Sequence, residues 1–151
     1  MNIKIRSVYS APAPNVWMLV KKSSTLVFVT RGFLGFAGAK RFPESWVEGD
    51  TITTRLLFFG FIPAWRHSIT FKKIDEKKCI LYTNEGGGLV PIWNHIIQVD
   101  VNDDQTCTYT DDVEVRAGVL TILVWMYAHI FYLYRQFRWR ILLKKMPYYV
   151  Y

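Results

Sequence analysis

Four titratable side chains stand out between residues 67 and 111: His67, Glu85, His95 and Asp111. A histidine beside a carboxylate can work as a general acid or base, and two histidines with one carboxylate can hold a metal ion. The same residue types also form buried polar networks that only stabilise a fold. The choice depends on whether the surrounding elements bring these side chains together.

Five segments between residues 50 and 116 have the composition of β-strands, and turn sequences separate them. The turns are "GFIPA", "DEKK", "GGGLV" and "NDDQ", which favour antiparallel hairpins between consecutive strands. The predicted strands cover residues 50–59, 65–74, 78–85, 91–101 and 106–116.

Alternate side chains of a strand point to the same face. In the last four segments the odd-numbered positions are mainly apolar, so the four titratable residues, all odd-numbered, are predicted to point inward. With hairpins centred near residues 76, 89 and 103, His67 lies opposite Glu85, Glu85 opposite Trp93, and His95 opposite Asp111. A shift of one residue would turn a strand's polar member outward.

The rest of the chain predicts one further strand and several helices. Residues 2–9 alternate as a half-buried strand, and a helix after "SAPAP" carries Val16, Trp17 and Val20 inward. Residues 24–42 fit either a second short helix or a strand, and their glycines favour a bent strand from about residue 33. Residues 119–146 lack proline and glycine and predict one long helix between Gly118 and Pro147.

One face of this long helix is predicted to meet the sheet. Arg135 and Arg138 lie near that face, and each is predicted to make a forked contact with Glu85 or Asp111. The predicted face consists of Leu120, Leu123, Tyr127, Phe131, Tyr134, Arg138 and Leu142.

Composition indicates a single domain over residues 1–151 with a sizeable core. Of the 151 residues, 51% are hydrophobic and 17% aromatic, so the core contains hydroxyl and indole donors and has room for a cavity. The formal net charge of +7 favours anionic partners in general without naming one. Basic residues are dense only between residues 135 and 145.

Cysteine spacing and the N-terminal sequence point to an intracellular protein. Cys79 and Cys107 fall in different predicted strands without a CxxC motif, so we expect small buried thiols rather than a disulfide or a zinc site. The first residues contain no apolar run of signal-peptide length, which predicts a cytoplasmic location. We expect no cofactor.

Several motifs together resemble the START/Bet v 1-like superfamily, also called SRPBCC or polyketide cyclase/dehydrase-type proteins. They are "SAPAPNVW", "WVEGD", "FGFIPAWRHSITF", "NHIIQVDV" before "CTYTDDVEV", and "FYLYRQFRWRILL". The resemblance covers nearly the whole chain. It includes no catalytic signature, no gate and latch motif of the plant hormone receptors, and no Rieske or metal-ligand arrangement.

The resemblance implies an α+β helix-grip fold: a seven-stranded antiparallel sheet wrapped around a long C-terminal helix, with short helices after the first strand. It also implies a deep cavity for a hydrophobic or amphipathic molecule. Residues 59–64, 86–91 and the stretch around Gly118 would frame the mouth. "EGGGLVP" would then be a flexible lid, with Glu85 just inside.

The leading functional hypothesis is a module that binds a lipid-like, polyketide-like or other aromatic molecule. Aromatic walls would come from Trp65, Trp93, Tyr109 and Tyr127. The predicted ligand-binding residues are His67, Glu85, Trp93, His95, Asp111, Tyr127, Arg135 and Arg138.

Three alternatives remain for the same residues. A cyclase/dehydrase or hydrolase would use His95 and Asp111 as an acid-base pair, with His67 or Glu85 as acid. A metal site would use both histidines and one carboxylate. The polar cluster would otherwise be purely structural.

Membrane and nucleic-acid partners are less favoured. Residues 119–134 are apolar with a basic flank, but the run is shorter than the ~20 residues that span a bilayer. We therefore expect a core helix and no stable membrane insertion. "RQFRWRILLKK" lacks a recognition motif, so we expect no nucleic-acid partner. The oligomeric state is predicted as monomer or homodimer.

Overall fold

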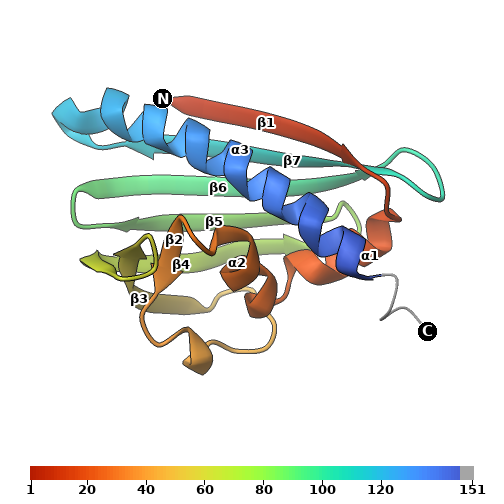
Figure 1. The fold of residues 1–151 in the computed structure, drawn as a ribbon, viewed down its shortest axis with the longest axis horizontal. Coiled ribbons are helices and arrows are strands. Elements are labelled where there is room, and N and C mark those ends of the chain that lie inside the picture. The colour runs from red at the N-terminus through yellow and green to blue at the C-terminus, as the bar shows by residue number, and fades with distance from the viewer. Residues whose placement is uncertain (147–151) are drawn as a thin grey trace.

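Alternating apolar and polar residues form seven strands of one antiparallel sheet. The computed structural model describes residues 1–146. The sheet has seven strands in the order β1-β7-β6-β5-β4-β3-β2, and each neighbouring pair is antiparallel (Figure 1). The strands are β1 (Asn2–Tyr9), β2 (Leu34–Phe36), β3 (Thr51–Phe58), β4 (Ile62–Asp75), β5 (Ile80–Gly87), β6 (Val90–Val101) and β7 (Cys107–Arg116).

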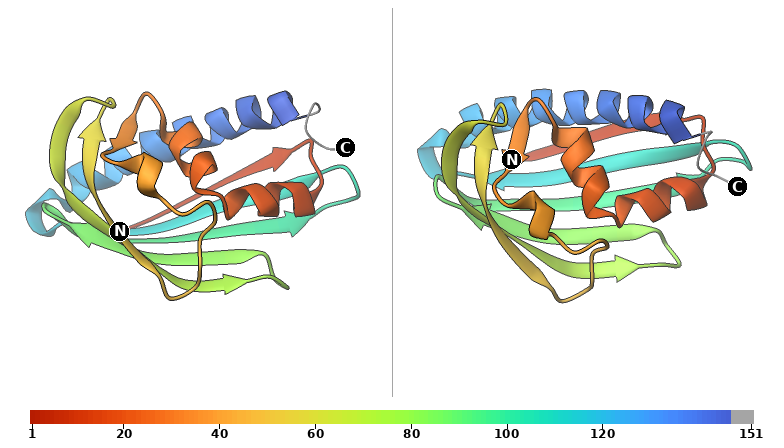
Figure 2. Two further views of the ribbon diagram at one scale, coloured as in Figure 1. Left: turned by 90° about the horizontal axis from the view of Figure 1, so that it is seen from below. Right: turned by 60° about the horizontal axis from the view of Figure 1, so that its bottom comes forward.

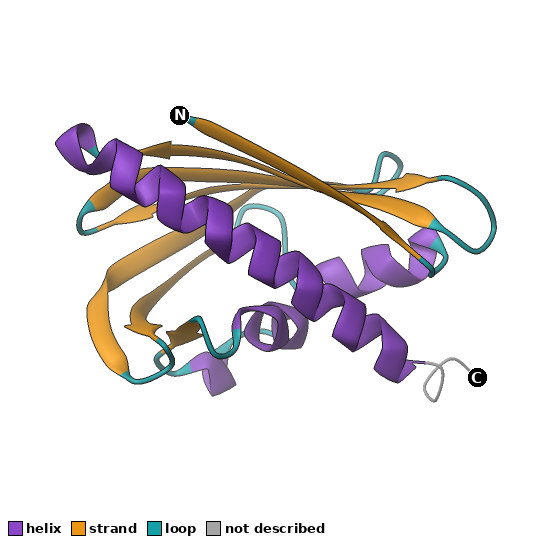
Figure 3. Ribbon diagram, turned by 45° about the horizontal axis from the view of Figure 1, so that its top comes forward, coloured by secondary structure: helices purple, strands orange, loops and turns teal. Residues whose placement is uncertain are grey.

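A long helix crosses the concave face of this curved sheet (Figures 2 and 3). This helix, α3 (Thr121–Lys145), follows a short 3-10 turn, η2 (Gly118–Leu120), and packs on β1, β7 and a second helix. That helix, α2 (Ser23–Thr30), lies with α1 (Ala13–Val20) at the end where α3 finishes. The arrangement is the predicted α+β helix-grip fold. The predicted boundary at Pro147 lies outside the described residues.

Residues 21–38 contain both a short helix and a strand, the two structures between which the sequence did not decide. Helix α2 ends at Thr30, and Gly32 then adopts φ 95°, a left-handed conformation that suits glycine and turns the chain. The short strand β2 follows and pairs with β3. A 3-10 turn, η1 (Ala39–Arg41), leads toward β3, so the expected bent strand is only three residues long.

The predicted inner face of α3 is partly wrong. Phe131 is buried as expected, but Leu123 is 65% exposed. Apolar residues occupy both sides of this helix, so hydrophobicity alone could not identify the packed side. The buried residues of α3 are Ala128, Phe131, Tyr132, Arg135, Gln136 and Trp139.

The apolar core has two parts, and α3 contributes to both. Trp139 belongs to the cluster formed with α1, and Phe131 belongs to the cluster formed with β1 and β7. The predicted inward residues Val16, Trp17 and Val20 of α1 are buried.

The two cysteines are free thiols. Cys107 is fully buried in β7, as expected, and burial raises its pKa to about 11. Cys79 is half-buried and lies in the turn before β5, with φ 51°, rather than in a strand. No disulfide joins them.

Candidate functional site

A cavity of about 100 Å³ lies between the concave face of the sheet and α3. Its wall is mostly aromatic and aliphatic, with contributions from α2, β3 to β6 and α3. Six of the predicted site residues line it: His67, Glu85, Trp93, His95, Tyr127 and Arg135.

The first polar pair in the cavity wall joins β4 to β5. His67 Nε2 and Glu85 Oε2 lie 3.2 Å apart, and the side chains are 8% and 13% exposed. Thr83 Oγ1 donates a 2.6 Å hydrogen bond to Glu85 Oε1. All three side chains line the cavity, so this pair can meet a ligand directly.

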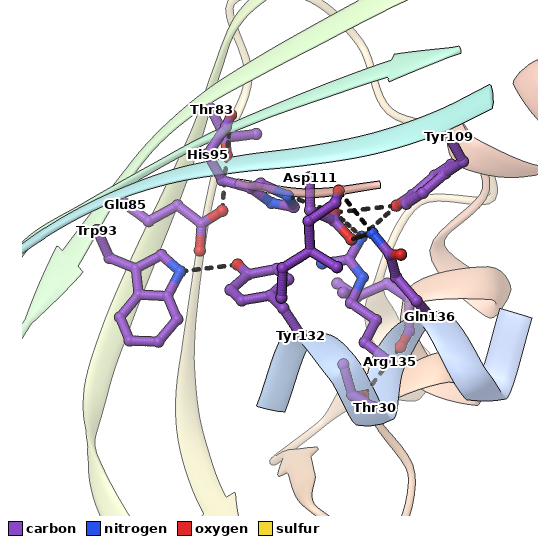
Figure 4. Close-up of polar contacts among 12 residues, drawn as sticks. Thr30, Thr83, Glu85, Trp93, His95, Tyr109, Asp111, Tyr132, Arg135 and Gln136 are labelled. Atoms are coloured by element: carbon purple, nitrogen blue, oxygen red, sulfur yellow. Dashed lines mark hydrogen bonds and ion pairs between the residues drawn. The ribbon is translucent and has the colours of Figure 1, made fainter. Parts of the chain in front are cut away.

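The second pair, His95 and Asp111, joins β6 to β7 and is more deeply buried (Figure 4). His95 Nε2 lies 2.8 Å from Asp111 Oδ1. Tyr109 donates its hydroxyl to the same oxygen at 3.1 Å, and Gln136 Nε2 donates to Asp111 Oδ2 at 3.0 Å. Both carboxylate oxygens of Asp111 are therefore engaged.

Arg135 connects the deep pair to the cavity. Its Nη2 donates a 3.3 Å hydrogen bond to the Tyr109 hydroxyl and lies 4.0 Å from Asp111 Oδ1. Its guanidinium also lies over the Tyr132 ring, 5.5 Å from the ring centroid. The predicted contact between Arg135 and Asp111 is thus present as a long ion pair rather than a forked one.

The predicted strand registers are each wrong by two residues, except at the middle hairpin. Glu85 lies opposite Trp93 as predicted, but its partner on β4 is Ile69. The turn between β4 and β5 pairs Asp75 with Ile80 and so lies further along the chain than predicted, and the bulge between Phe71 and Lys73 reverses one residue of that shift. On the other side His95 lies opposite Val113, since a loop of residues 102–106 centres the hairpin near residue 104.

A two-residue shift preserves the face on which a side chain points. Each histidine therefore meets its predicted carboxylate diagonally instead of directly, within reach of their side chains. The predicted inward faces are also confirmed, because His67, His95 and Asp111 are buried.

Within the described part of the chain, four residues predicted to contribute to the site do not line the cavity. Arg138 binds the Phe28 carbonyl through Nε and Nη2 at 3.3 and 3.0 Å and stacks on the Phe28 ring, away from both carboxylates. Within residues 1–146, Arg138 and Asp111 are not among the cavity-lining residues. Of the four predicted aromatic walls, Trp93 and Tyr127 line the cavity, whereas Trp65 and Tyr109 do not.

The glycine segment expected to act as a lid is instead a tightly packed hairpin end. Gly87 belongs to β5, and Val90 begins β6 after a two-residue turn. A Cβ atom at Gly87 would collide with the Arg66 carbonyl, and one at Gly88 would collide with the Trp65 side chain. Glycine is required here because neighbouring groups approach the backbone closely. Among residues 1–146, none of residues 59–64 or 86–91 lines the cavity, although Phe58 and Glu85 beside them do.

Sequence reasoning missed several residues that complete the site. Trp93 Nε1 donates to the Tyr132 hydroxyl at 2.9 Å, and the Tyr132 ring meets His95 edge-on with centroids 5.0 Å apart. Gln136 follows Arg135 and also donates to the Ile5 carbonyl at 2.9 Å. A polar Arg-Gln pair inside an apolar helix was the sequence signal for its buried face.

Four buried polar atoms of the cavity wall find no hydrogen-bond partner within residues 1–146. They are Arg135 Nε, His67 Nδ1, Tyr127 Oη and Trp139 Nε1. Most buried polar groups in proteins are hydrogen-bonded, so each exception calls for a physical explanation. Here the exceptions all belong to residues that line one cavity, and they come from two elements, β4 and α3.

The electrostatics keep both carboxyl groups charged. Burial raises the pKa of Glu85, but the hydrogen bond and charge of His67, with contributions from His95 and Thr83, outweigh it and hold that pKa below its usual value. Burial acts likewise on Asp111, and the Arg135 charge with the His95 and Gln136 hydrogen bonds brings its pKa below the usual range. Burial raises the pKa of Tyr127 to about 12, so its hydroxyl stays protonated at neutral pH.

This geometry supports binding or proton transfer more readily than metal coordination. Among residues 1–146, no group of three or more histidine, cysteine, aspartate or glutamate side chains is placed to hold a metal ion. The histidines instead pair separately, each with its own carboxylate. The two-histidine, one-carboxylate metal site is therefore not formed by the described residues.

Sequence comparison does not identify a family, since no family model and no curated protein matches this chain. Solved structures do match. A protein from Chromobacterium violaceum is 11% identical with a TM-score of 0.73, over 93% of this chain and 95% of that one. A START superfamily protein from Mycobacterium smegmatis is 9% identical with a TM-score of 0.70, over 96% and 98%.

Norcoclaurine synthase from Thalictrum flavum, solved in complex with dopamine and hydroxybenzaldehyde, also matches. It is 12% identical with a TM-score of 0.58, over 82% of this chain and 73% of that one. At these identities the likeness concerns the fold. The chain has the START/Bet v 1-like fold that its motifs resemble.

Proposed function

We propose that this chain, with its START/Bet v 1-like fold, binds a small hydrophobic or amphipathic molecule in the cavity beneath α3. Ligand sites are usually concave and apolar, with a few polar groups that fix the orientation of the ligand. The cavity combines aromatic walls from Trp93 and Tyr127 with the polar groups of His67, Glu85 and Arg135.

The observation that carries this proposal is the set of unpartnered polar atoms in the cavity wall. A buried N–H or O–H without a partner costs roughly 1–3 kcal/mol of stability. Arg135 Nε and Trp139 Nε1 are donors, and the Tyr127 hydroxyl can donate as well. A ligand with hydroxyl or carbonyl oxygens would satisfy these groups.

The cavity volume favours an aromatic ring over a long lipid chain. Drug-sized ligands occupy about 300–1,000 Å³, whereas an apolar cavity of about 150 Å³ already holds benzene. The cavity of about 100 Å³ is smaller still, so one ring is the upper limit, and a larger ligand requires side chains of the wall to move. The phenolic ligands of the norcoclaurine synthase structure are of this class.

Catalysis is the second candidate, and one observation favours it. His95 lines the cavity while its Nε2 is held 2.8 Å from the Asp111 carboxylate. A histidine oriented by a carboxylate at a ligand cavity can transfer protons, as a cyclase/dehydrase or hydrolase requires. Product formation by the wild type that is lost in His95→Gln, with ligand affinity kept, would favour this candidate.

Native mass spectrometry of freshly purified protein, with analysis of the denatured extract, tests the binding proposal. A matched pair of variants on β6 sharpens it. Ile97 lines the cavity and Val99 does not, although both are buried. We expect Ile97→Phe to fill the cavity and abolish the bound mass, whereas Val99→Leu keeps it. If the wild type is purified without a ligand, calorimetric titration with 4-hydroxybenzaldehyde replaces the measurement of bound mass. Equal affinity of the wild type, Ile97→Phe and Val99→Leu would contradict the proposal.

A further inference from the structure

Helix α3 carries a second apolar face, which is exposed on the surface of the described structure. Each residue of this outer stripe is between 52% and 65% exposed. The outer stripe consists of Ile122, Leu123, Met126, Ile130, Leu133 and Phe137.

The outer stripe follows helical spacing. Its members recur at intervals of three and four residues and extend for about 22 Å along the helix axis. His129 is the sole exposed polar residue of α3 between Thr121 and Phe137, and α3 contains no acidic residue. An uninterrupted exposed apolar face of this length indicates an interaction surface.

The length and apolar composition of α3 are also those of a membrane-spanning helix, yet hydrogen bonds connect this helix to the sheet. The segment Gly118–Lys145 is long and apolar enough to cross a bilayer, and 22% of its most apolar window is buried. Its inner side holds Arg135 and Gln136, which are hydrogen-bonded to Tyr109 and Asp111. The outer stripe can therefore meet a bilayer only from its surface.

Two cations continue the outer stripe toward the end of α3. Arg140 and Lys144 follow Phe137 at spacings of three and four, and both are exposed. Within residues 1–146 neither forms a salt bridge. An apolar helix face with cations at one end matches the interface of an anionic bilayer, where acyl chains and headgroup phosphates lie side by side.

We propose that the outer stripe of α3 docks in the plane of a lipid bilayer that carries anionic headgroups, with Arg140 and Lys144 on the phosphates. A second copy of this chain fits the surface less well. If the outer stripes of two copies paired, no carboxylate of α3 would face the two cations, because α3 contains none. Lipid supplies the apolar and the anionic component together.

The test measures partition of the full chain into vesicles by flotation. The probes are vesicles of phosphatidylcholine alone and vesicles with about one-third phosphatidylglycerol. The stripe variant is Leu123→Gln/Ile130→Gln. Its matched control is Val8→Gln/Val101→Gln, which alters two side chains of similar exposure, 61% and 70%, elsewhere on the surface.

We expect wild type and control to bind anionic vesicles alike and the stripe variant to bind about tenfold more weakly, because it loses buried apolar area. Arg140→Gln/Lys144→Gln should lose on the order of tenfold in affinity for anionic vesicles while its weaker affinity for phosphatidylcholine is unchanged. All substituted side chains are exposed, so thermal unfolding should confirm that the variants fold.

Two results would overturn the proposal. One is failure of the wild type to float with anionic vesicles, or equal flotation of wild type and stripe variant. The other is a dimer in sedimentation velocity without lipid that the stripe variant converts to monomer, which would assign the outer stripe to a second copy. Neither result depends on what the cavity binds.

Discussion

The two histidine-carboxylate pairs of this protein have the same chemistry and different surroundings. Asp111 is fully buried, receives hydrogen bonds from Tyr109 and Gln136, and does not line the cavity among the described residues. Glu85 lines the cavity with its partner His67, whose Nδ1 has no partner within residues 1–146. The Asp111 carboxylate, with both oxygens paired, stabilises the fold, whereas Nδ1 of His67, unpaired among the described residues, is available to a ligand.

The largest effect should come from breaking the network around Asp111. Asp111→Ala leaves Arg135 and His95 buried without their carboxylate, so we expect a loss of about 3–5 kcal/mol in the free energy of unfolding. Urea denaturation measures it. The control is the neighbouring Asp112→Ala, which removes an exposed 3.3 Å ion pair with Lys4 and should cost less than about 1 kcal/mol. Similar losses in both variants would show that the network does not stabilise the fold.

Acid should weaken both pairs in a defined direction. Because the folded-state pKa values of Glu85 and Asp111 are lowered, their contribution to stability is full above the unfolded values of about 4.5 and 3.8. It is lost as pH falls through the lower folded-state values. Stability should therefore decline below about pH 5. The loss should be smaller than in Asp111→Ala, since a protonated carboxyl keeps its shape.

The double variant Glu85→Gln/Asp111→Asn isolates this pH dependence. Thermal unfolding between pH 7 and pH 3 should show a shallower decline than in the wild type, because neither amide titrates. An unchanged decline would place the acid sensitivity in other carboxyl groups.

Substitution within the cavity pair should change binding more than stability. Glu85→Gln keeps the shape of a partly exposed side chain, so we expect a loss of about 1 kcal/mol in stability. Ligand affinity should fall about tenfold, since the charge facing the cavity is removed. Denaturation and calorimetric titration of the same samples measure the two effects. A large loss of stability with unchanged affinity would make this pair structural as well.

No loss of stability is expected at Tyr127, and this position gives a sensitive comparison. Its hydroxyl has no partner within residues 1–146, whereas the Tyr132 hydroxyl accepts a 2.9 Å hydrogen bond from Trp93. Because Tyr127→Phe removes an unpaired buried hydroxyl, it should raise the stability of the ligand-free protein by about 1 kcal/mol, whereas Tyr132→Phe should lower it by about 1 kcal/mol. Weaker ligand binding by Tyr127→Phe without a loss of stability would mark its hydroxyl as a ligand contact.

The sequence predicted the face of the sheet on which a side chain points better than it predicted which residues of neighbouring strands pair. A strand's period of two residues made the inward direction of His67, His95 and Asp111 readable without knowing the turns. The opposed partners were wrong by two residues, because the sequence marked neither the centre of the β4–β5 turn, with its bulge near Phe71, nor the loop of residues 102–106. A register shift by an even number of residues keeps each side chain on the same face, so both histidine-carboxylate pairs still form.

Prediction was weakest for α3, because this helix carries apolar side chains on all its sides. Leu123 and Arg138 were placed toward the sheet, yet Leu123 is exposed and Arg138 binds a carbonyl of α2. The packed face is set by Arg135 and Gln136, because Asp111 and Tyr109 supply the partners that make their burial tolerable. Such partners lie far away in the sequence, so periodicity could not reveal them.

The most direct test of ligand binding is an amide chemical-shift titration of ¹⁵N-labelled protein with 4-hydroxybenzaldehyde, alongside the Ile97→Phe variant. We predict saturable shifts in the wild type that centre on the cavity strands and on α3 near Tyr127 and Arg135, and none of them in the variant. Shifts that persist in the cavity-filled variant, or that arise only on the outer surface, would contradict binding in this cavity.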